Sequence, residues 1–236
     1  MVTGISDQDD VTTDGAGAPR GSGEGGPGGG TPAVERMVFF SDAVVAIALT
    51  LLALELPVPA GGSDAEVWHS FREKVPEYVM FLLSFAVIAA MWTSHHWLFR
   101  YVAGWTRRLM WLNFSWLLGI VLVPFVTKLL IELSGRQLSA VAYGSVVGGA
   151  SLTMLRMQHH CRVAGLLTPS ASPLVMRHFR VRTTFPTVAF LASIPLAFVN
   201  PDLAMYSWPV ASGVTALAGR VLLRRGRHAV TGPHPD

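Results

Sequence analysis

Ionisable side chains interrupt the apolar segments of this 236-residue chain at a few places, and they are its main candidates for chemistry. Asp42 lies near the start of the first apolar segment, and the pairs His95-His96 and His159-His160 lie near the ends of two others. A carboxylate among apolar side chains costs several kcal/mol unless it is paired or hydrated. Histidines are common ligands of metal ions and haem. These residue types therefore leave open a structural polar cluster, a water-exposed helix end and a metal site.

A metal or haem site has weak support in the sequence. Adjacent histidines on a helix point about 100° apart, so each pair supplies one useful ligand. The chain has one cysteine, Cys161, and neither a His-Glu-x-x-His nor a Cys-x-x-Cys motif. We therefore expect no metal, no cofactor and no enzymatic activity, and we keep a haem or metal membrane enzyme as a minor alternative.

The composition is typical of an integral membrane protein. Hydrophobic residues make up 51% of the chain and charged residues 14%, whereas soluble domains carry about 25% charged residues. Six apolar segments are long enough to cross about 30 Å of hydrocarbon as helices, at residues 37–56, 76–99, 109–131, 138–158, 181–199 and 203–223. We predict an all-α integral membrane protein with six transmembrane helices per chain.

The two ends of the chain differ from these segments in composition, and the charges between them set an orientation. Residues 1–33 are rich in Gly and bury too little apolar surface to offset the entropy of ordering. We predict a disordered tail at 1–33, a six-helix domain at 34–226 and a short tail at 227–236. Of the 18 Lys and Arg residues, fourteen fall on the N-terminal side of the predicted membrane and four on the other. This excess predicts cytoplasmic termini at both ends.

The predicted topology brings polar residues of three helices to a similar depth near the cytoplasmic side. The second helix runs inward, so Trp92 and His95 lie level with Asp42, and Asn113 enters from the third helix. We expect a polar cluster that locks the first helix against the second and third. Arg36 is a second candidate partner of Asp42, although six residues is a poor spacing for one helix face. The alternative is that Asp42 caps a helix end in contact with water.

The first helix also carries an aliphatic stripe. Ile47, Leu51 and Leu54 follow the i, i+4, i+7 spacing and share a narrow face, with Thr50 beside them. Asp42 lies about 140° around the helix from Ile47. By itself the stripe fits a lipid-facing or core-facing surface as well as a pore lining.

The first three apolar segments carry motifs that resemble those of a known protein family. The pattern Arg36-x-x-x-Phe40-Ser41-Asp42, followed by AVVAIALTLLALEL, resembles the first helix of the transmembrane protein 175 family of potassium channels. The segments LLSFAVIAAMWTSHHWLF and LNFSWLLGIVLVPFVTKLL are similar to its second and third helices. One signature and six spans resemble the prokaryotic form, which has one repeat per chain.

The resemblance implies an assembly and roles for individual residues. Prokaryotic members of the family form homotetramers in which the first helix of each subunit lines a central pore. Aliphatic layers form the constriction, and by motif position they correspond here to Ile47, Leu51 and Leu54, with Thr50 adjacent to the pore. The expected structural polar network comprises Arg36, Phe40, Ser41, Asp42, Trp92, His95 and Asn113.

The expected function is that of a moderately potassium-selective cation channel whose aliphatic rings act as filter and gate by dewetting. Its partners are then K⁺, the lipid bilayer and further copies of the chain, with no nucleic acid, and its place is the cell membrane. A weakly selective cation or proton leak is the main alternative, and a secondary transporter is a lesser one, because the two halves show no inverted repeat. Glu55, near the outer end of the first helix, either concentrates cations or is simply solvated.

Overall fold

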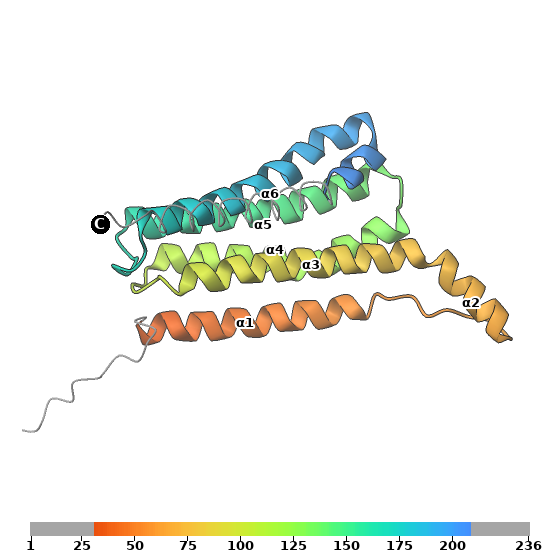
Figure 1. Cartoon of the computed structure of the whole chain (residues 1–236), viewed down its shortest axis with the longest axis horizontal. Helices are drawn as coiled ribbons and strands as arrows, with labels where there is room; N and C mark the ends of the chain where they lie inside the picture. Colours follow the sequence, from red (N-terminus) through yellow and green to blue (C-terminus); the bar gives the residue numbers. More distant parts are fainter. Residues whose placement is uncertain (1–30, 209–236) are drawn as a thin grey trace, which may run out of the picture.

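The computed structural model describes residues 31–208, which form five long helices and one short one. They are α1 (Pro32–Ala53), α2 (Asp64–Glu73), α3 (Val75–Phe99), α4 (Arg107–Glu132), α5 (Gln137–Val163) and α6 (Pro173–Val199). The long helices lie roughly side by side along the longest axis of the molecule (Figure 1). The described residues 201–208 are helical as well.

The helices are arranged around α4 and α5. α4 packs against α1, α3 and α5, and α5 in turn packs against α6. In Figure 1, α1 therefore lies along one side of the bundle, α3 and α4 lie next to it, and α5 and α6 form the opposite side. Within residues 31–208, α1 packs mainly against α3 and α4, so much of its surface is not covered by the other described helices.

Five helices of the described part are long and apolar enough to cross a membrane, and they correspond to the first five predicted segments. α1 begins at Pro32 rather than at residue 37, because proline is well suited to the first helical position. α6 begins well before residue 181, because the Ser172 side chain caps it by accepting a hydrogen bond from the Val175 N–H at 3.3 Å. Most of the sixth predicted span, 203–223, and nearly all of both predicted tails, 1–33 and 227–236, lie outside the described residues.

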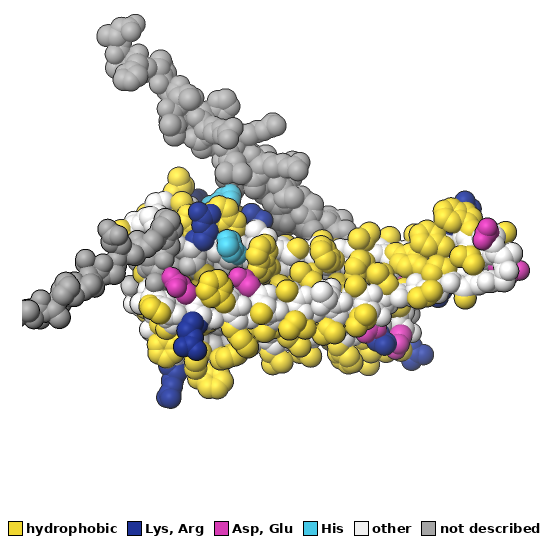
Figure 2. Space-filling view, turned by 90° about the horizontal axis from the view of Figure 1, so that it is seen from below, with side chains coloured by type: hydrophobic (Ala, Val, Ile, Leu, Met, Phe, Trp, Pro, Cys, Tyr) yellow, Lys and Arg dark blue, Asp and Glu magenta, His cyan; other side chains and the backbone are white. Residues whose placement is uncertain are grey.

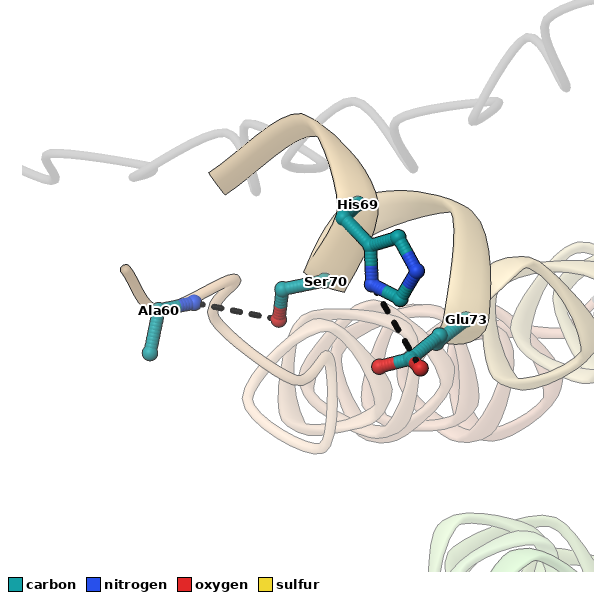
Figure 3. A network of polar contacts seen from close by, with 4 residues as sticks. All are labelled: Ala60, His69, Ser70 and Glu73. Carbon is teal, nitrogen blue, oxygen red and sulfur yellow. Dashed lines mark hydrogen bonds and ion pairs between the residues drawn. The ribbon is translucent and has the colours of Figure 1, made fainter. Parts of the chain in front are cut away.

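The segment between α1 and α3 contains a short helix, α2, that the apolar segments of the sequence do not predict. α2 begins with a variant of the capping box: the Glu66 N–H donates to Ser63 Oγ at 3.4 Å, and the Glu66 carboxylate accepts from the N–H of Gly62, the residue before the cap, at 2.7 Å. Figure 3 shows two further contacts of α2, the Ala60 N–H donating to Ser70 Oγ and His69 facing Glu73 across one turn. These bonds hold the loop after α1 against α2.

Small residues allow close contact between α5 and α6, as the Gly144-x-x-x-Gly148 spacing indicates. A Cβ atom on Gly144 would lie 2.9 Å from Ser193 Oγ and 3.2 Å from the Phe190 carbonyl oxygen of α6. A Cβ atom on Gly148 would lie 2.8 Å from Leu191 Cδ2. The two glycines therefore form the α5 surface on which α6 packs.

Candidate functional site

α1 has two distinct faces, and they divide its residues by environment. Its buried face carries Ser41, Val45, Ala48 and Leu52 at spacings of three and four residues, and packs on α3 and α4. Its exposed face carries the aliphatic stripe: Ile47 is 58% exposed, Leu51 45% and Leu54 78%. The stripe lies about 120° around the helix from the buried face.

Thr50 lies on the exposed face of α1 as well, next to the stripe. Its hydroxyl donates to the Ile47 carbonyl oxygen at 2.8 Å, which satisfies its one proton within the helix. Viewed from the α1 side, the molecule presents a broad surface of hydrophobic side chains, with charged side chains toward its two ends (Figure 2). The middle of α1 is therefore a large apolar surface that the other described residues of the chain leave exposed.

A chain of hydrogen bonds ties the inner end of α1 to the neighbouring helices. Asn113 Nδ2 on α4 donates to Ser41 Oγ at 2.8 Å, and Asn113 Oδ1 lies 2.8 Å from His95 Nε2 on α3. Ser41 Oγ donates in turn to the Met37 carbonyl oxygen at 2.8 Å. All three polar side chains are buried, so each bond forms away from water. We call Ser41, His95 and Asn113 the inner cluster.

The inner cluster fixes the tautomer and orientation of His95. Because the amide nitrogen of Asn113 donates to Ser41, its carbonyl oxygen must accept, and His95 Nε2 carries the proton. The imidazole stacks on Trp116 at 4.3 Å between centroids and also contacts Phe99 at 4.3 Å. His95 Nδ1 has no hydrogen-bond partner within the described part of the chain. Packing against Trp116 and Phe99 thus holds the imidazole plane in the orientation in which Nε2 can donate to Asn113 Oδ1.

Asp42 is paired by a separate contact beside the inner cluster. Trp92 Nε1 on α3 donates to Asp42 Oδ1 at 2.8 Å, and the Trp92 ring lies 5.4 Å from that of His96. Phe40, on the same helix as Asp42, makes an edge-to-face contact with Phe114 of α4 at 5.9 Å. Asp42 is only half-buried, so it is both paired and close to water, which combines the two environments considered for it.

Arg36 does not come into the inner cluster. It is exposed, and no ion pair or hydrogen bond of its side chain is found among residues 31–208. The reason is helical geometry: α1 is continuous from Pro32, and this places Arg36 about 20° around the helix from Ile47, on the exposed face. The remaining residues of the expected network, from Phe40 to Asn113, lie where α1, α3 and α4 meet.

A second buried polar cluster, which the sequence does not predict, joins α3, α4 and α5. Thr127 Oγ1 on α4 lies 2.8 Å from Ser84 Oγ on α3, and Ser84 Oγ lies 3.1 Å from the Tyr143 hydroxyl on α5. Thr127 Oγ1 also lies 2.8 Å from the Val123 carbonyl oxygen. We call Ser84, Thr127 and Tyr143 the outer hydroxyl cluster. Its sequence signal is a hydroxyl side chain well inside each of three apolar segments.

Glu55 has a cationic partner at the outer end of α1. Its Oε2 lies 3.0 Å from Lys128 Nζ on α4, and both side chains keep contact with solvent, at 28% and 50% exposure. The stripe residue Leu54 immediately precedes it. In a single copy of the chain, the charge of the Glu55 carboxylate is therefore balanced by Lys128. Glu55 is neither simply solvated nor free to attract cations.

No group of three metal-ligating side chains gathers within the described residues. The two histidine pairs also have different local partners: His95 faces Asn113, whereas His160 Nε2 lies 2.9 Å from Thr106 Oγ1. The polar residues at the end of the bundle where α1 begins therefore form hydrogen bonds between helices.

Comparison with known proteins places this arrangement in a family. The family model described as endosomal/lysosomal potassium channel TMEM175 matches residues 36–124, which contain the α1 face and the whole inner cluster. A potassium channel of Streptomyces collinus is 33% identical over 187 residues, covering 77% of this chain and 89% of that protein. A potassium channel of Chamaesiphon minutus is 31% identical over 176 residues, covering 72% of this chain and 87% of that protein.

A solved structure shares the fold over nearly its whole length. The crystal structure of a lysosomal potassium-selective channel TMEM175 homolog from Chamaesiphon minutus is similar to this chain with a TM-score of 0.68 and 27% identity. The similarity covers 80% of this chain and 99% of the other. With a family model over its motif-bearing segment and a relative aligned over most of both sequences, the chain belongs to the transmembrane protein 175 (TMEM175) family.

Proposed function

We propose that this chain is the subunit of a homotetrameric, moderately potassium-selective channel of the cell membrane, in which α1 of each copy lines one central pore. Membership of the TMEM175 family supports this, as do the names of its bacterial relatives, which are potassium channels. The five apolar helices agree with a multi-pass membrane protein. In this proposal both termini are cytoplasmic and a sixth span follows α6.

The observation that carries the proposal is the uncovered aliphatic face of α1. Ile47, Leu51 and Leu54 are exposed along a helix whose opposite side is buried and hydrogen-bonded to its own bundle. A helix fixed in this way presents its stripe in a defined direction. Four such helices around an axis would enclose rings of Ile and Leu, the narrowest of which we assign to Ile47.

Such rings would discriminate between ions, and would open or close the pore, through the hydration of the ion and of the ring. Aliphatic side chains offer no oxygen ligands, so an ion passing them must keep part of its water or briefly shed it. Potassium holds its water less tightly than sodium, and a tight apolar ring therefore favours potassium. When the ring narrows, water leaves it and conduction stops, and when the ring widens, water returns. Thr50 would then lie beside the constriction, and the permeant ion needs no resident cofactor.

The experiment that tests this proposal is potassium flux through the purified protein in lipid vesicles, native against Ile47→Asn. We expect the native protein to pass K⁺ in preference to Na⁺. The polar side chain of the variant should hydrate the narrowest ring, enlarge the current and reduce the potassium preference. Leu118→Asn is the matched control, because Leu118 is an exposed aliphatic residue of α4 outside the stripe, and it should leave selectivity unchanged.

Two results would contradict the proposal. The first is a folded native protein without potassium flux, and the second is an Ile47→Asn variant with unchanged current and selectivity. Reversal potentials across K⁺, Na⁺ and pH gradients separate the proposed function from a weakly selective cation or proton leak. A leak would show reversal potentials that follow Na⁺ or pH as closely as K⁺.

A further inference from the structure

The end of the bundle at which α1 begins carries an unpaired positive charge. α3 and α5 end here, and α4 and α6 begin here (Figure 1). The arginines along these helix ends are all exposed, at Arg100, Arg107, Arg108, Arg156, Arg162, Arg177, Arg180 and Arg182. Within residues 31–208 none of them is paired with a carboxylate, since the ion pairs found there are His69–Glu73 and Lys128–Glu55.

An aromatic contact between α3 and α6 joins the two helix ends that carry three of these arginines. The rings of Trp97 and Phe179 are 6.0 Å apart, which brings the end of α3 against the start of α6. The Arg100 guanidinium carbon lies 4.6 Å from the centroid of the Trp97 ring. Arg177 lies two residues before Phe179 and Arg180 one residue after it, on the exposed surface of α6, and the two arginines are about 60° apart around the helix. We call Arg100, Arg177 and Arg180 the basic seam.

The loops on both sides of the basic seam are tied together. The Ala103 N–H donates to the Leu166 carbonyl oxygen at 2.8 Å, and the Thr168 N–H donates to the Tyr101 carbonyl oxygen at 2.8 Å. Tyr101 also contacts Phe179, with the ring centroids 6.1 Å apart. The backbone that carries the seam is thus held in place by hydrogen bonds and does not depend on a ligand to order it.

We propose that the basic seam binds the headgroup of an anionic phospholipid. Trp, Tyr and Phe at the ends of apolar helices mark the depth of the bilayer interface, which is where headgroup phosphates lie. Guanidinium groups match the planar oxygen geometry of phosphate and can remain stacked on an aromatic ring while binding it. Basic clusters at this depth attract anionic lipids. The chemistry is the same whichever side of the membrane this end faces.

The N-terminal residues provide a competing source of negative charge. Asp7, Asp9, Asp10, Asp14 and Glu24 are all in residues 1–30, which precede α1 in the sequence. We favour the phospholipid because its phosphate is present at high local concentration at the depth of Trp97 and Phe179, and because its acyl chains would lie along exposed apolar helix surface.

The test measures lipid selectivity of the full chain reconstituted in phosphatidylcholine vesicles. Spin-labelled phosphatidylglycerol and spin-labelled phosphatidylcholine report how strongly each lipid associates with the protein. We expect native protein to prefer phosphatidylglycerol. The variant Arg100→Gln/Arg177→Gln/Arg180→Gln should reduce that preference at least fivefold, since one interfacial arginine contributes about that factor. The matched control, Arg72→Gln/Arg136→Gln at the opposite end of the bundle, should keep the native preference.

Several outcomes would overturn the inference. One is a native protein that associates equally with both lipids, and another is an equal loss of preference in the triple variant and the control. A third is a phosphatidylglycerol association that rises several-fold when the five N-terminal acids are changed to Asn and Gln, which would show that this segment occupies the seam. Potassium flux is measured on the same vesicles, so that a failure of channel function is seen separately from a failure of lipid binding.

Discussion

The two buried polar clusters differ in the helices that they join, although both lie in the same bundle. The inner cluster connects α1 to α3 and α4 through Ser41, His95 and Asn113. The outer hydroxyl cluster connects α3, α4 and α5 through Ser84, Thr127 and Tyr143, and includes no residue of α1. Buried hydrogen bonds therefore hold α1 at its inner end, whereas α3 and α4 are joined to each other in both halves of the bundle.

This difference indicates which part of α1 can move. Beyond the inner cluster, α1 is held by apolar contacts of Ala48 and Leu52 and by the ion pair of Glu55 with Lys128. Apolar contacts slide more easily than hydrogen bonds, and exposed ion pairs are weak and screened by salt. The stripe residues Ile47 to Leu54 lie in this half. If the stripe forms a gate, the inner end of α1 would anchor that gate to the part of the bundle formed by α3 and α4, while the rest of α1 could move.

The largest effect is expected from breaking the inner cluster with Asn113→Leu. The substitution removes two buried hydrogen bonds, leaving His95 Nε2 without its acceptor and Ser41 Oγ without its donor, so the free energy of unfolding should fall by about 2–4 kcal/mol. Denaturant titration in detergent measures this change. The matched control is Thr93→Ala, because the Thr93 hydroxyl bonds only to the Ala89 carbonyl oxygen of its own helix. Equal losses in both variants would contradict the role given to the cluster.

A somewhat smaller effect is expected where α5 meets α6. Gly144→Val places side-chain atoms where Ser193 and the Phe190 backbone already lie, so overpacking should lower the stability of the folded bundle by about 1–3 kcal/mol. Gly149→Val is the control, because a Cβ atom at Gly149 has no neighbour within 4 Å. Thermal unfolding in detergent compares the two, and an equal loss at Gly149 would show that helix propensity causes the effect.

Sequence reasoning places His95 and Asn113 of the inner cluster at one depth but gives no sign of the outer hydroxyl cluster, and the reason is physical. Asp42, His95 and Asn113 are costly in an apolar segment, so their presence alone requires partners, and the topology places them at one depth. Ser and Thr carry no such requirement, because they can bond to their own helix backbone as Thr93 does. Nothing in the residue types of Ser84 and Thr127 therefore shows that they bond across helices.

Other features of the fold also fall into those that the sequence predicts and those that it does not. The five long helices could be predicted from the length of their apolar segments alone. α2 is apolar only in part and too short to span a membrane, although its Ser63-x-x-Glu66 capping box marks its start. The position of Arg36 depends on whether α1 bends near its start, and periodicity carries no information about a bend.

The outer hydroxyl cluster provides a test of moderate size. Ser84→Ala removes the hydroxyl that lies between Thr127 and Tyr143, so stability should fall by about 1 kcal/mol, near the usual value for hydrogen bonds between membrane helices. Potassium flux should remain at the native level because the cluster does not touch α1. If potassium flux changed strongly while stability stayed the same, this would contradict the inference that the outer hydroxyl cluster is separate from the mobile half of α1.

The smallest effect on stability, but a measurable one on current, is expected from Lys128→Gln. The change leaves the Glu55 carboxylate without its cation at the outer end of α1. If α1 lines a pore, four such carboxylates attract K⁺ and raise the inward current at low ionic strength, and salt screens the effect. The double variant Glu55→Gln/Lys128→Gln should restore the native current. A current that rises equally in the double variant would show that Glu55 is not the cause.

The central claim is that Ile47 faces a water-filled path between subunits, and cysteine accessibility tests it most directly. The native Cys161 is buried and can be changed to Ala. In that background, potassium current through Ile47→Cys should be blocked by Cd²⁺ or by a charged, membrane-impermeant thiol reagent. Val45→Cys, on the buried face of α1, and Leu118→Cys, on the exposed surface of α4, should not respond. An Ile47→Cys channel that conducts normally and reacts only with lipid-soluble reagents would contradict the account.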